Sequence, residues 1–282
     1  MRINTNVSSL GAQEASINTN NSIKNSLEKL STGLKINKAS DDASGLAIAD
    51  KLRTQVTSIN QGVSNGNSAV ALLQIADKSM AEQSKILDTV KAKLIQANTD
   101  TTSEDGRNAI AKDVSKLLAQ LNNIATQTNY NGTNLLQASR ASSDAQPPLS
   151  FQIGENKDDI ISTKTIQANT SGYALTQLVT DSAAATFTRA HATAGQSAVD
   201  SAITTLNGYR GDIGSTQNQV ESAVRNLMTQ STNIKAAESV IRDVDYAEES
   251  ANFNKLNIIS QAGSYAISQS NATQQNVLRL LQ

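Results

Sequence analysis

The chain has 282 residues, a formal net charge of −1 and no cysteine. It is long enough for one or two domains with a core, but it excludes disulfide and thiolate chemistry and has no run of like charge that would predict nucleic-acid binding. With no tryptophan, three phenylalanines and five tyrosines, its apolar content is largely aliphatic. This composition favours long, narrow helical packing over a thick globule.

Both ends of the chain carry helical patterns with very few charges. Between residues 3 and 23 the only charged residue is Glu14, and residues 250–282 contain only Lys255 and Arg279. Chain ends are normally polar and fray in water. We therefore interpret the apolar residues of both ends as a surface that is buried when copies of the chain assemble. The residues assigned to it are Ile3, Val7, Leu10, Ile17, Leu256, Ile259, Ile267, Val277, Leu278, Leu280 and Leu281.

The first half of the chain predicts two long helices. A heptad pattern indicates one helix from near residue 43 to near residue 97. A capping-box pattern at residues 101–104 and a second periodic stretch at 110–124 predict the next helix. We expect it to end near residues 129–132, where Asn131-Gly132 supplies a residue tolerant of positive φ. We expect both stripes to form intramolecular core. The positions of the first stripe are Leu52, Val56, Ile59, Val63, Gly66, Val70, Leu73, Asp77, Met80, Ser84 and Leu87.

The middle of the chain changes character around the two adjacent prolines, Pro147 and Pro148. Residues 151–154 and 160–166 alternate like strands on either side of a polar segment, which predicts a β-hairpin within about 139–176. Residues 181–193 predict a loop or a weak helix. From Val199 to Ile241 a single heptad phase predicts another long helix, which can run back against the first-half helices.

The fold class predicted by these patterns is mainly α, with long antiparallel heptad-patterned helices in a coiled bundle and a small β-hairpin region in the middle. We expect residues 1–44 and 238–282 to form one domain of terminal helices. Residues 45–237 are expected to form a second, rod-like helical domain that carries the hairpin.

The sequence offers no catalytic constellation and predicts no cofactor or metal. His191 is the only histidine, which leaves no histidine pair for zinc and no supported triad. The glycines form no phosphate-binding motif. No stretch has the roughly 20 apolar residues of a membrane span, and the start lacks the apolar core of a cleaved secretory signal. We therefore expect neither an enzyme nor a membrane partner.

Several segments closely resemble bacterial flagellin. They are MRINTN at residues 1–6, LSTGLKIN at 30–37, ASDDASGLAIA at 39–49, YNG at 130–132 and QQNVLRLL at 274–281. The resemblance covers residues 1–138 and 196–282. The middle of this chain has no room for the large outer domains of long flagellins. It implies a subunit of the flagellar filament, exported by the flagellar type III route without a cleaved signal and located in the extracellular flagellum.

The resemblance also implies partners. The chain would polymerise with itself, its paired termini forming the inner part of the filament, and would meet the flagellar export chaperone, the filament cap and the hook–filament junction proteins. Two alternatives stay open at this point. One is a hook–filament junction protein of the same apparatus; the other, from a different class, is a signalling coiled-coil bundle.

One stretch departs from the flagellins that Toll-like receptor 5 detects. The flagellins of that group typically carry the segment LQRVRELAVQ on the first long helix, whereas the similar stretch here, residues 87–96, reads LDTVKAKLIQ. The receptor-contacting Arg, Glu and Leu of the family correspond to Thr89, Ala92 and Lys93, and Asp113 falls where the family has a further contacting Glu. The resemblance therefore implies a poor ligand for this receptor.

Overall fold

The structure, a computed structural model, describes residues 5–140, 143–184 and 186–280. The chain divides into two compact units. The terminal unit comprises residues 1–56 and 232–282, and contains α1 (Val7–Thr32) and α6 (Tyr246–Leu280). The central unit comprises residues 57–231 and contains most of α2 (Ala43–Ala97) and α5 (Arg189–Arg242), together with α3 (Glu104–Gln127) and α4 (Thr176–Ala183).

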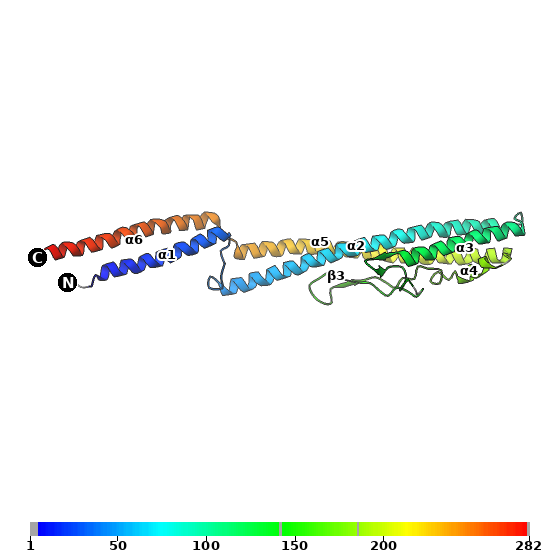
Figure 1. Ribbon diagram of the computed structural model, residues 1–282, viewed down its shortest axis with the longest axis horizontal. Helices are drawn as coiled ribbons and strands as arrows, with labels where there is room; N and C mark the ends of the chain where they lie inside the picture. Colours follow the sequence, from blue (N-terminus) through cyan, green and yellow to red (C-terminus); the bar gives the residue numbers. More distant parts are fainter. Residues whose placement is uncertain (1–4, 141–142, 185, 281–282) are drawn as a thin grey trace. The chain divides into compact units, whose positions relative to one another are not determined.

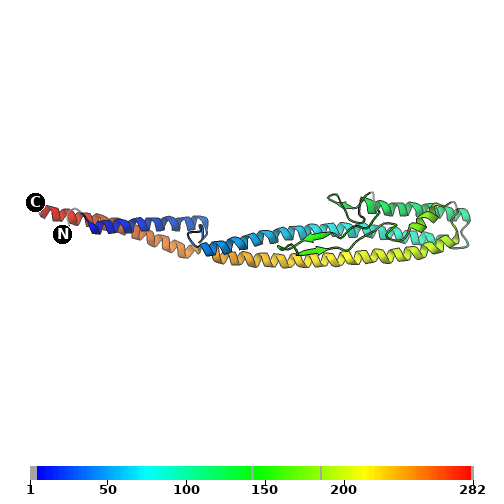
Figure 2. The same cartoon turned by 90° about the horizontal axis from the view of Figure 1, so that it is seen from below.

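Within the central unit, α2 and α5 pack side by side in antiparallel directions, as Figures 1 and 2 both show. Cross-contacts fix this direction. Asn60 accepts a hydrogen bond from Ser231 at 3.1 Å, and Asp77 pairs with Arg210 at 2.9 Å. The predicted mainly α fold with long antiparallel helices is confirmed, and the predicted helix from residue 43 to residue 97 coincides with α2.

The buried stripe of α2 shares only every second position with the predicted one. The shared positions Ile59, Gly66, Leu73, Met80 and Leu87 are buried. The alternate positions are displaced by one residue. At three of them a smaller side chain than the predicted one lies in the core, whereas Gln83 is larger than the predicted Ser84. Those intervening buried positions are Gly62, Ala69, Ala76, Gln83 and Val90. Small residues in a seam allow helix backbones to approach closely. The larger of two neighbouring side chains is therefore not always the one that is buried.

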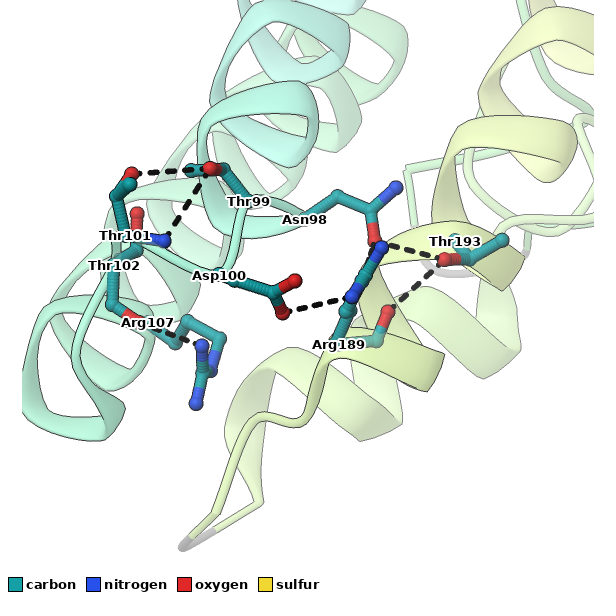
Figure 3. A network of polar contacts seen from close by, with 8 residues as sticks. All are labelled: Asn98, Thr99, Asp100, Thr101, Thr102, Arg107, Arg189 and Thr193. Carbon is teal, nitrogen blue, oxygen red and sulfur yellow. Dashed lines mark hydrogen bonds and ion pairs between the residues drawn. The ribbon is translucent and has the colours of Figure 1, made fainter.

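The turn between α2 and α3 is tied to the start of α5 by polar contacts (Figure 3). Arg189 forms an ion pair with Asp100 at 2.7 Å and donates from Nε to Asn98 Oδ1 at 3.3 Å. Thr193 donates to the same Asn98 oxygen at 3.0 Å. Ser103 caps α3 by accepting from the backbone N–H of residue 106 at 3.2 Å. The helix thus begins two residues later than the capping box at residues 101–104 predicts, because that pattern places the N-cap at Thr101.

Two short antiparallel hairpins interrupt the helices. Strands β1 (Asn129–Tyr130) and β2 (Thr133–Asn134) are joined by Asn131 and Gly132, whose φ angles are +49° and +81°. Helix α3 ends at Gln127, so the Asn-Gly pair takes the expected positive φ values in a tight hairpin turn and not at the end of the helix. Strands β3 (Ser150–Gln152) and β4 (Ile160–Ser162) form the predicted hairpin, with Phe151 opposite Ile161.

A polar network lies inside the apolar core of the central unit. Gln83 is fully buried on α2, and its side-chain amide donates to the carbonyl oxygens of Leu121 on α3 (3.2 Å) and Ala168 (2.8 Å). Its oxygen accepts from the hydroxyl of buried Tyr173 at 2.9 Å. Burial raises the pKa of the Tyr173 phenol far above its usual range, with a smaller contribution from Tyr209. The network joins α2, α3 and the segment before α4.

Candidate functional site

The terminal helices have clear local signals at their boundaries. Asn6 caps α1 by accepting from the N–H of Ser9 at 3.1 Å, and Gly33 ends it in the left-handed conformation with φ +74°. Asp245 stands before α6 and accepts from the N–H groups of Ala247 and Glu248 at 2.9 and 3.2 Å. The two helices lie side by side and antiparallel (Figures 1 and 2).

The faces on which α1 and α6 meet are rich in small and polar residues. Ser26 is the one residue of α1, among those described, that is fully buried. The other shielded positions are half-buried and recur every three or four residues, as in a heptad seam. On α1 they include Ala12, Ser16, Thr19, Ile23 and Leu30, and on α6 Phe253, Leu256, Ser260, Gly263, Ile267 and Ser270.

The large apolar side chains of these helices mostly face solvent. Val7 is 68%, Leu10 55%, Ile17 54% and Ile259 42% exposed. These four belong to the predicted assembly surface, whereas Leu256 and Ile267 are half-buried. Other large apolar residues of these helices, which the prediction omitted, are exposed as well; they are Leu27, Tyr246, Ile258 and Tyr265.

The remaining predicted assembly residues cannot be placed by their side chains. Ile3 and Leu281 lie outside the described residues. Val277, Leu278 and Leu280 belong to α6, but their side chains lie outside the described part. The exposed large apolar side chains that the structure describes therefore lie between Val7 and Leu27 on α1 and between Tyr246 and Tyr265 on α6. Several exposed large apolar side chains on two adjoining helices favour an interaction site.

The four receptor-region residues lie in the central unit. Thr89 and Ala92 are exposed on α2, and the Thr89 hydroxyl donates to the carbonyl oxygen of Lys85 at 2.9 Å. Lys93 forms an ion pair with Asp113 of α3 at 3.1 Å. The fold therefore brings Lys93 and Asp113 together, and the Asp113 carboxylate is engaged by a cation of its own chain.

Other candidate chemistry does not converge. His191 is half-buried on α5, its ring lies 5.8 Å from that of Phe187, and its Nδ1 accepts from the N–H of Thr188 at 3.4 Å. The described part of the chain holds no group of three or more His, Cys, Asp or Glu that could bind a metal. Among its described residues, none of the helices is long and apolar enough to cross a membrane.

Comparisons with known proteins agree along the whole chain. Residues 3–141 match the model of the bacterial flagellin N-terminal helical region, and residues 196–281 match that of the C-terminal helical region. The chain is 32% identical over 285 residues to the flagellar filament 33 kDa core protein of Treponema phagedenis, and 33% identical over 303 residues to flagellin of Bacillus subtilis. Both alignments cover all of this chain and all of the relative.

Solved structures show the same fold. The crystal structure of Bacillus cereus flagellin matches with a TM-score of 0.50 and 24% identity, over 62% of this chain and 94% of that chain. A structure described as a flagellar hook-associated protein of Vibrio parahaemolyticus matches with a TM-score of 0.59 and 12% identity, over 72% of this chain and 99% of that chain. At these identities the likeness concerns the fold alone.

Paired terminal helices with outward apolar side chains, together with these matches, define a structural subunit of the bacterial flagellum. The chain belongs to the bacterial flagellin family. It is a subunit of the flagellar filament, a non-enzymatic protein of the extracellular flagellum that assembles with copies of itself. The alignments to flagellins over the whole length of the chain decide against the two alternatives, the hook–filament junction protein and the signalling coiled-coil bundle.

Proposed function

We propose that the terminal helices supply the contacts that hold the filament together, and that the central helices hold each subunit together. In this proposal residues 1–44 and 238–282 form the inner part of the filament, and residues 45–237 form a rod-like domain around it. The observation that carries the proposal is the outward exposure of Val7, Leu10, Ile17 and Ile259, while the faces on which the two helices meet hold many small and polar residues.

The energetics favour this division. Burying a large aliphatic side chain contributes roughly 1.5–3 kcal/mol, and in a helical polymer the gain is repeated at every subunit. In the central unit the comparable side chains are already buried, among them Leu87, Leu94, Val199 and Leu206. Apolar area that remains to be covered is therefore concentrated on the terminal helices.

Truncation tests the proposal directly. A chain lacking residues 1–40 and 245–282 should remain soluble, helical and monomeric, and should not be incorporated when added to filament seeds. Sedimentation and electron microscopy measure this outcome. Filaments formed by the truncated chain would contradict the assignment.

Point variants test it without removing chain. Leu10→Asn and Ile17→Asn change exposed apolar residues of α1, so helix pairing should survive while the concentration needed for assembly rises at least about tenfold. Ser8→Asn, which changes a neighbouring exposed polar residue, is the matched control and should assemble normally. Equal assembly of all three variants would contradict the proposal.

We further propose the partners that follow from membership of the flagellin family. They are the flagellar export chaperone, the filament cap and the hook–filament junction proteins, met after type III export without signal cleavage. We also propose weak recognition by Toll-like receptor 5. Support for the latter comes from Thr89 and Ala92, which offer no charge at positions where detected flagellins carry Arg and Glu, and from Lys93, which holds Asp113.

A further inference from the structure

Polar contacts join α1 to α6 at three levels along their length. Near the end of α1, the Ser26 hydroxyl donates to the carboxylate of Glu249. Further along, Ser260 donates to Asn20 Oδ1 at 3.4 Å. At the start of α1, Asn6 Nδ2 donates to the carbonyl oxygen of Ser270 at 3.2 Å. The three levels pair residues in strictly reversed order, so they describe one antiparallel register.

Apolar packing alone specifies this register weakly. Between the levels at Asn6 and Asn20 the facing positions are mostly small, and small residues pack equally well at several axial offsets; they include Ala12, Ser16 and Gly263. The large apolar side chains that do lie in the seam, such as Ile23, Leu256 and Ile267, are only half-buried. In coiled coils with such seams, a polar contact in the interface is the usual determinant of register.

We propose that these polar contacts fix the axial register of α1 against α6, with the pair Ser26 and Glu249 as its main determinant. Ser26 is 2% exposed, and its partner is a charged acceptor, which makes this hydrogen bond stronger and its loss more costly than the other two. A slip of seven residues would leave the carboxylate of Glu249 without the Ser26 hydroxyl.

A backbone bridge is the competing determinant. The N–H of Lys35 donates to the carbonyl oxygen of Arg242 at 2.6 Å, and the N–H of Val244 donates to that of Gly33 at 3.0 Å. These bonds fasten the segment after α1 to the segment before α6, close to Ser26. Any test must therefore separate the side-chain pair from the bridge.

The consequence for the filament rests on the proposed function. Apolar residues of α1 and α6 can form one surface only in a fixed register, because a seven-residue slip moves one helix about 10 Å along the other. Register thus determines which outward residues of the two helices lie beside one another when a second copy of the chain binds.

Disulfide trapping measures the register, and the chain has no cysteine to interfere. In the full-length chain, Asn20→Cys with Ser260→Cys reports the observed register and leaves both outer polar levels intact. Asn20→Cys with Phe253→Cys, or with Ile267→Cys, reports a slip of seven residues in either direction. Each pair is scored by mass spectrometry in the soluble chain and in sedimented filaments.

In sedimented filaments of the otherwise unchanged chain, we expect only the first pair to crosslink. Adding Ser26→Ala and Glu249→Leu should raise the ratio of slipped to observed crosslinks at least about tenfold. Glu249→Gln keeps an acceptor of the same length and should restore the observed register. Val244→Pro removes one bond of the bridge, keeps both side chains of the pair, and should leave the ratio unchanged.

Two results would overturn the inference: a unique observed register in the variant lacking the pair, or a slip produced by Val244→Pro alone. Absence of the first crosslink in the unchanged chain, in both fractions, would overturn it as well. A failure of the proposed function gives a different result. The chain would then crosslink in the observed register, and the variants Leu10→Asn and Ile17→Asn would assemble as well as the unchanged chain.

Discussion

The backbone of Gly62 on α2 lies directly against the carbonyl oxygen of Ile153, at the end of β3. A Cβ built at Gly62 would lie 1.8 Å from that oxygen. Beside it, Asn65 donates to the carbonyl oxygen of Gln152 at 3.0 Å, and Ile153 is buried against Val220 and Val224 of α5. The absence of a side chain at residue 62 therefore lets the β3–β4 hairpin seat on the long helices.

This contact predicts opposite effects for two glycine substitutions. Gly62→Ala must push the hairpin away and should lower the free energy of unfolding by about 1–3 kcal/mol. Gly211→Ala, within α5, meets nothing within 4 Å and should raise it by roughly 0.5–1 kcal/mol, because alanine favours the helix. Urea unfolding followed by circular dichroism measures both. Equal effects of the two substitutions would refute the close contact.

A second prediction concerns alkaline stability. The folded chain keeps the Tyr173 phenol protonated because burial raises its pKa, whereas the unfolded chain releases that proton near pH 10. The contribution of the protonated phenol to the free energy of unfolding is therefore fully present below about pH 10 and is lost as the pH rises above that value. Tyr173→Phe leaves Gln83 Oε1 without its donor and should cost about 1–3 kcal/mol at neutral pH.

The same variant should lose stability less steeply above pH 10, because it no longer has a buried phenol to titrate. Unfolding curves at a series of pH values check this. Tyr130→Phe is a control for tyrosine content, since that ring is half-buried at the edge of the core and no hydrogen bond in the Gln83 network depends on it. Parallel stability profiles for the unchanged chain and Tyr173→Phe would contradict the prediction.

A third prediction concerns acid stability of the segment between α1 and α2. The Asp41 carboxylate accepts from the N–H groups of Lys38 and Asn37 at 2.9 and 3.0 Å, and these bonds hold its pKa below the usual range. The resulting stability is present above about pH 4 and is lost as the pH falls through the lowered pKa. Asp41→Asn should therefore flatten the acid limb of the stability profile.

Thermal unfolding between about pH 2 and pH 6 tests the third prediction. Asp88→Asn, at an exposed position of α2, serves as the control for removing one carboxylate. An acid limb as steep in Asp41→Asn as in the unchanged chain would show that these two hydrogen bonds do not couple to folding.

A fourth prediction concerns the terminal helices before assembly. Ordering a residue costs about 1–2 kcal/mol of backbone entropy, and among the described residues of α1 only Ser26 is fully buried in return. Amides of α1 and α6 should therefore exchange rapidly in the soluble chain and slowly in filaments. Residues 72–97, which line the core of the central unit, should be protected in both states. Strong protection of residues 5–30 in the soluble chain would disprove it.

A fifth prediction concerns the innate receptor. The unchanged monomeric chain should activate Toll-like receptor 5 weakly. An Arg in an interface can contribute about 2 kcal/mol or more of binding free energy, and the Thr89 hydroxyl cannot replace the two parallel hydrogen bonds of a guanidinium group. The combined variant Thr89→Arg, Ala92→Glu and Lys93→Leu should gain activity, and loss of Lys93 also frees the Asp113 carboxylate.

Dose responses in reporter cells compare the two proteins of the fifth prediction. Thr89→Lys in place of Thr89→Arg, within the same combination, separates added charge from bidentate geometry and should recover less activity. Equal, strong signalling by the unchanged chain and the combined variant would contradict the prediction.

Local sequence signals determined most of the secondary structure. No proline occurs between residues 43 and 97, and a sustained heptad period there predicted α2 in full. The alternation on either side of residues 155–159 predicted the β3–β4 hairpin, and the Asn131-Gly132 pair predicted positive φ. These features follow from the conformational preferences of neighbouring residues, which require no partner to be known.

The tertiary structure decided which face of each helix is covered. On α2 the covered row runs through Gly62, Ala69 and Ala76 instead of the larger side chains one residue further on, because a close approach of α5 and the hairpin favours small residues. On α1 the covered row contains Ser16, Thr19 and Ser26, and Leu10 and Ile17 stay outside. A heptad period fixes the spacing of a stripe, but only the partner's shape and polar groups select the stripe that is buried.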